Sequence, residues 1–134
     1  MLSYDPDSCP QPHAITAAAA SLLVSDIPFP RAVAGVRVVM VDSKFVINPT
    51  VQEQEGSTLD LLVAGTTAAV LMIEGSAKFV PEATVLDAIA AAHRAIGEIC
   101  SQLQVCPHSH NRLLCLPFKS ANRTMASSVC GDSA

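Results

Sequence analysis

Short apolar runs alternate with polar turn residues along the middle of this 134-residue chain. From residue 36 to residue 41 the pattern has the period of two that a strand shows. Asp42-Ser43 then predicts a tight turn, and residues 44–48 predict the returning strand of a hairpin. That strand ends at Pro49, because proline has no N–H to donate to a sheet.

Two later runs, residues 59–64 and 69–73, are almost continuously apolar, as expected of strands that are covered on both faces. Gly65-Thr66-Thr67 separates the two runs and predicts a second hairpin. Residues 50–58, between the two hairpins, are mostly polar and predict a connection. Four strands in this order predict an antiparallel meander.

Helical periods flank the strands. Residues 13–25 are rich in alanine and predict a first helix, which Pro28 and Pro30 bring to an end. Residues 81–104 predict a second helix with a proline in its first turn. The expected apolar stripes are Ile15, Ala19, Leu22 and Leu23 in the first helix, and Leu86, Ile89, Ile96, Ile99, Cys100 and Leu103 in the second. The sequence therefore predicts an α+β fold: helix, four-stranded antiparallel meander, helix, with the helices packed on one sheet.

The same pattern predicts the domain organisation. A chain of this length holds one domain with a modest core. Residues 1–12 contain three prolines and predict an extended lead-in, and residues 13–106 predict the folded domain. Residues 107–134 show no sustained hydrophobic period, so we expect a disordered tail.

Composition narrows the class of protein. Half of the residues are hydrophobic, yet the longest charge-free apolar stretch, between Asp60 and Glu74, has only 13 residues. A membrane span needs about 20, so the sequence predicts a piece that buries apolar surface within a larger assembly and does not cross a membrane. The net charge of −4 excludes a global basic field for nucleic acid. Five cysteines at irregular spacing, with no signal peptide, indicate an intracellular, reducing compartment.

Several segments of the chain resemble the polynucleotide phosphorylase family of phosphate-dependent 3′-to-5′ exoribonucleases. The resemblance extends from about residue 5 to residue 104 and includes the family's segments in the same order. These segments are Ser25-Asp26-Ile27-Pro28, Ala34-Gly35-Val36-Arg37-Val38, Phe45-Val46-Ile47-Asn48-Pro49-Thr50, Leu59-Asp60-Leu61-Leu62-Val63-Ala64-Gly65-Thr66 and Ala69-Val70-Leu71-Met72-Ile73-Glu74-Gly75. The wording of the second segment is most similar to the plastid branch, so a chloroplast, a mitochondrion or a bacterial cytoplasm is the expected location.

The resemblance implies a subunit with two RNase PH-type cores and RNA-binding modules that assembles as a homotrimer. This chain resembles the second half of the first core, the copy that contributes to the ring and to RNA threading but not to bond breaking. The partners implied are RNA, through the complete assembly, and a second RNase PH-type core. We expect the remaining parts of such an enzyme to lie outside this chain.

The resemblance also implies that the complete enzyme uses inorganic phosphate and magnesium. The family's active core holds phosphate with a serine pair before its first helix, where this chain has Cys9-Pro10-Gln11-Pro12. Gln52 and Thr58 stand where that core has its main metal-binding acids, and only Asp60 keeps a carboxylate. Glu53 and Glu55 are possible replacement ligands for a hard cation, but a solvated loop is the simpler interpretation. We therefore predict no catalytic and no metal-binding residue in this chain, and the sequence assigns no RNA-binding residue.

The sequence contains three other kinds of residue that are candidates for a chemical role. His93 falls on the apolar stripe of the second helix, which favours a packed, hydrogen-bonded side chain over a general base. Arg37, among valines, favours an ion pair over a phosphate contact, and Arg31 favours a surface charge over an RNA contact. Four possible zinc ligands lie close together, but their spacing matches no standard zinc module: Cys106, His108, His110 and Cys115.

One further match lies near the C-terminus. Residues 124–131 resemble the stretch that follows the serine pair in the family's second core, either by chance or as a scrap of that core. Two functions remain open on the sequence alone. The first is a partial polynucleotide phosphorylase that supplies a non-catalytic scaffold. The second is a stand-alone, non-catalytic RNase PH-like module that binds a protein partner or RNA.

Overall fold

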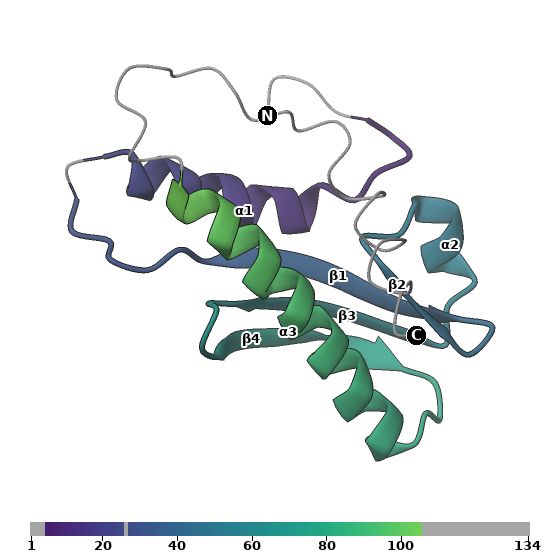
Figure 1. Cartoon of the computed structure of the whole chain (residues 1–134). Coiled ribbons are helices and arrows are strands. Elements are labelled where there is room, and N and C mark those ends of the chain that lie inside the picture. Colours follow the sequence, from purple (N-terminus) through teal and green to yellow (C-terminus); the bar gives the residue numbers. More distant parts are fainter. Residues whose placement is uncertain (1–4, 26, 106–134) are drawn as a thin grey trace, which may run out of the picture.

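The computed structural model of the protein describes residues 5–25 and 27–105 (Figure 1). The elements, in chain order, are α1 (Pro10–Leu23), β1 (Ala34–Val41), β2 (Lys44–Ile47), α2 (Val51–Glu55), β3 (Leu59–Gly65), β4 (Val70–Ala77) and α3 (Glu82–Val105). The four strands form one antiparallel sheet, and α3 crosses it (Figure 1). The predicted α+β fold with a helix on either side of four strands in the sequence is confirmed. In the described ranges no helix is both long and apolar enough to cross a bilayer.

The strand order in the sheet is β2-β1-β3-β4, which corrects the predicted meander. β1 lies between β2 and β3, because the eight-residue strand is longer than its hairpin partner and apolar along most of its length. The edge of β1 that faces away from β2 is therefore available to β3, and there Ala34 to Met40 pair with Gly65 to Leu59. The chain reaches that edge through the segment that contains α2.

The short helix α2 was missed by the sequence analysis, which predicted a plain connection. Thr50 is its N-cap, and the Thr50 hydroxyl accepts a hydrogen bond from the Glu53 N–H at 3.4 Å. The Glu53 carboxylate accepts in return from the Thr50 N–H at 2.8 Å. This reciprocal capping box stabilises a helix start, and its Thr-x-x-Glu pattern is readable in the sequence.

The first helix also begins earlier than predicted. α1 starts at Pro10, so residues 10–12 are helical and do not belong to an extended lead-in. Proline suits the first turn of a helix because the N–H groups there have no partner within the helix. Pro12 is buried, and the hydroxyl of Thr16 donates to the Pro12 carbonyl oxygen at 3.0 Å.

The two long helices contact opposite sides of β1. A Cβ atom on Gly35 would lie 3.0 Å from Cδ1 of Ile15, so the backbone of β1 approaches α1 closely there. Neighbouring residues of a strand point to opposite faces, and Ala34 and Val36 belong to the core under α3. That core contains Ala32, Ala34, Val36, Val38, Leu59, Leu61, Val63, Ala88, Ala92, Ile96, Cys100 and Leu103.

The buried stripe of α3 is narrower and smaller in side-chain volume than predicted. Ala88, Ala92 and Ile96 are fully buried, whereas Leu86, expected in the stripe, is 60% exposed. Cys100 continues the stripe, and its thiol donates to the carbonyl oxygen of Ala32 at 3.4 Å. Alanines at these positions allow α3 to lie close to the sheet. Leu86 lies two residues before Ala88, about 200° around the helix from it, so its side chain is directed away from the buried row.

The two strands of the second hairpin differ in burial, which corrects part of the prediction. β3 is covered on both faces, as its apolar run indicates. β4, with an equally apolar start, is an edge strand whose side chains are exposed from Leu71 to Ala77. A short apolar run has the same appearance whether a neighbouring strand and helix cover it or leave it open.

Gly75 gives a test of how closely β3 and β4 approach. A Cβ atom on Gly75 would collide with the backbone carbonyl oxygen of Asp60 in β3, which cannot move without disturbing the ladder. We expect Gly75→Ala to lower the free energy of unfolding by about 1–3 kcal/mol, as overpacking does. Urea denaturation followed by circular dichroism measures the change.

Gly97→Ala is the matched control, because a Cβ atom on Gly97 in α3 would meet nothing within 4 Å. Alanine is the better helix former, so this variant should gain about 0.5–1 kcal/mol. Equal effects of the two substitutions would contradict the close approach at Gly75.

Candidate functional site

An ion pair between Arg37 and Asp60 lies on the face of the sheet that Gly35 shares with α1. Arg37 Nε donates to Asp60 Oδ1 at 2.7 Å, and Nη2 donates to Oδ2 at 2.9 Å. Both side chains are largely buried, with exposed fractions of 16% and 17%. The hydrogen bond to Asp60 raises the pKa of Arg37 further above its ordinary value, although burial alone would lower it. The predicted ion pair of Arg37 is confirmed.

Three more side chains complete the hydrogen-bonding of this pair. Arg37 Nη1 donates to Oε1 of Gln11 at 2.7 Å and to the sulfur of Cys9 at 3.0 Å. Gln54 of α2 donates to Asp60 Oδ2 at 2.9 Å. The segment at the start of α1 thus directs two side chains, Cys9 and Gln11, to Arg37. The guanidinium group is held by the start of α1 and by β3, and the carboxylate by β1 and α2.

The acidic residues considered as metal ligands have separate structural roles. Glu53 closes the capping box of α2, and Asp60 binds Arg37 and Gln54. Glu55 is exposed on the last turn of α2. In residues 5–25 and 27–105 no three His, Cys, Asp or Glu side chains come together as a possible metal site.

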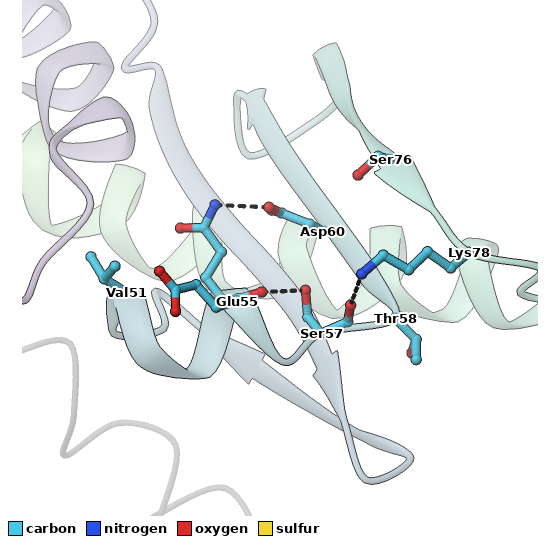
Figure 2. A pocket seen from close by; sticks show the side chains of 8 residues that line it. Val51, Glu55, Ser57, Thr58, Asp60, Ser76 and Lys78 are labelled. Carbon is cyan, nitrogen blue, oxygen red and sulfur yellow. Dashed lines mark hydrogen bonds between the residues drawn. The ribbon is translucent and has the colours of Figure 1, made fainter.

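A polar pocket opens beside Asp60, between α2 and the ends of β3 and β4 (Figure 2). Its volume is about 290 Å³, and it is lined by Val51, Gln54, Glu55, Ser57, Thr58, Asp60, Ser76 and Lys78. Lys78 Nζ donates to the carbonyl oxygen of Ser57 at 3.4 Å. Of the two residues predicted to stand where the active core has metal-binding acids, Thr58 lines the pocket and Gln52 does not. One ammonium group, several hydroxyl groups and two carboxylates therefore line the pocket. Arg37 already binds one of the two carboxylates, that of Asp60.

The remaining predicted residues lie away from this pocket. His93 Nε2 is 3.1 Å from the carbonyl oxygen of Thr66, in a partly buried position, so the packed, hydrogen-bonded interpretation is confirmed. Arg31 is exposed in the segment before β1. The possible zinc ligands at residues 106–115 and the match at residues 124–131 lie outside the described residues.

Sequence reasoning did not find Cys9, Gln11 or Gln54 as partners of the ion pair. One signal was available, because an arginine within a valine-rich strand needs an acceptor and Asp60 is the acid within the neighbouring apolar run. The two glutamines gave no such signal, since glutamine is common on exposed helix surfaces. Only the approach of α1 and α2 to the same face of the sheet brings them to the pair.

The ion pair makes a prediction about stability. Asp60→Asn leaves the buried Arg37 guanidinium with a neutral, weaker acceptor, so we expect the free energy of unfolding to fall by about 1–3 kcal/mol. Glu55→Gln changes an exposed acid of the same pocket and should stay within about 0.5 kcal/mol of the parent. Chemical denaturation at neutral pH measures both, and equal effects would show that the pair adds no stability.

Known proteins similar to this chain point to one family. Residues 31–95 match the model described as 3′ exoribonuclease family, domain 2. Polyribonucleotide nucleotidyltransferases of Protochlamydia amoebophila and Chlamydia pneumoniae are 49% and 52% identical to this chain over 102 and 103 residues. A probable polyribonucleotide nucleotidyltransferase 1, chloroplastic, of Oryza sativa is 43% identical over 103 residues.

These matches cover most of this chain and a small part of each relative. They include 76–77% of the chain but 15% of each chlamydial protein and 11% of the rice protein. The predicted resemblance is confirmed, and a chloroplastic protein is among the relatives, at lower identity than these two chlamydial ones. Residues 31–95 therefore belong to the 3′ exoribonuclease family as its second domain, and about three quarters of the chain is homologous to one segment of the polyribonucleotide nucleotidyltransferases.

Proposed function

We propose that this chain is a partial polyribonucleotide nucleotidyltransferase whose role is that of the non-catalytic scaffold of the first RNase PH-type core. In a complete enzyme of this family it would pack against a second RNase PH-type core, within a homotrimer that degrades RNA with phosphate and magnesium. The observation that carries the proposal is the Arg37–Asp60 pair. Asp60 is the single acid retained at the positions that correspond to the metal-binding residues, and Arg37 already binds its carboxylate.

The side chains at the site do not fit the chemistry of phosphorolysis. That reaction needs donors that hold phosphate and acidic groups that hold a divalent metal near the scissile bond. Pro10 and Pro12 have no N–H, and Cys9 and Gln11 direct their side chains to Arg37. Thr58 offers a neutral hydroxyl in place of a carboxylate. A neutral hydroxyl binds a hard cation more weakly than a carboxylate does. No step of the reaction is assigned to these residues.

Exposed apolar side chains support a role in an assembly. Among the described residues, five of the seven large hydrophobic side chains that remain exposed lie between residues 71 and 86. They are Leu71, Met72, Ile73, Phe79 and Leu86. Apolar groups gathered in one part of a surface mark a contact with another protein more often than scattered ones do. A scaffold core that is covered by a second core would have such a surface.

The alternative, a stand-alone non-catalytic module that binds a protein partner or RNA, has one observation in its favour. The core under α3 closes within residues 32–103, with nine of its members at 0% exposure. A chain with such a core has the interior that independent folding needs. For either function the chloroplastic and bacterial relatives support a chloroplast or a bacterial cytoplasm as the location, and a mitochondrion stays a prediction from the sequence.

Absence of catalysis is directly testable. The purified chain, incubated with poly(A), inorganic phosphate and magnesium, should release no ADP, because the site lacks the phosphate donors and the paired acids. Chromatography of the nucleotides measures the product, and the complete Chlamydia pneumoniae relative is the positive control. ADP release that Asp60→Asn abolishes would overturn the proposal.

The scaffold and the stand-alone module differ in what they bind. The scaffold should associate with the separately expressed second core of the Chlamydia pneumoniae relative, which size-exclusion chromatography with light scattering detects as a complex. A cooperatively folded chain that ignores the second core would favour the stand-alone module.

A further inference from the structure

We draw no further inference here: the strongest candidate, the exposed apolar side chains of β4 and of the segment that follows it (Leu71, Ile73 and Phe79), carries none, because nothing in the structure shows what covers them.

Discussion

The Arg37–Asp60 pair is the interaction that links the parts of this structure on the α1 side of the sheet. Its bonds connect β1 to β3, and the same two side chains bind Gln11 near the start of α1 and Gln54 in α2. A buried charge is costly unless its hydrogen bonds are made, and here two strands and two helices provide them. The position of α2, and with it the pocket beside Asp60, depends on this network.

On the other side of the sheet the constraint is close packing of small side chains. Ala88 and Ala92 of α3 are fully buried against the core. On the α1 side, Gly35 allows the close approach of Ile15. β1 is covered on both sides because the two helices converge on it. Apolar side chains of β4 remain exposed from Leu71 onward, although the start of that strand is as hydrophobic as the buried β3.

The same network underlies the proposal that this chain does not catalyse phosphorolysis. Cys9 and Gln11 bind Arg37, and the Asp60 carboxylate is paired with the same arginine. A charge that stabilises the fold in this way is not free to hold a metal. The polar groups at this place are part of the hydrogen-bonding that holds the structure together.

The sequence alone determined the four strands and the two long helices, the two hairpins, the family resemblance and the ion-pairing tendency of Arg37, because these follow from local periodicity, turn residues and matched segments. It did not determine the strand order, since a polar connection of nine residues can return to either edge of a hairpin. It also could not distinguish the buried β3 from the exposed β4, or Ala88 from Leu86 as the residue that packs in α3. Those outcomes depend on where the helices lie over the sheet, and only the tertiary structure decides that, because burial and buried hydrogen bonds arise between segments that are far apart in the chain.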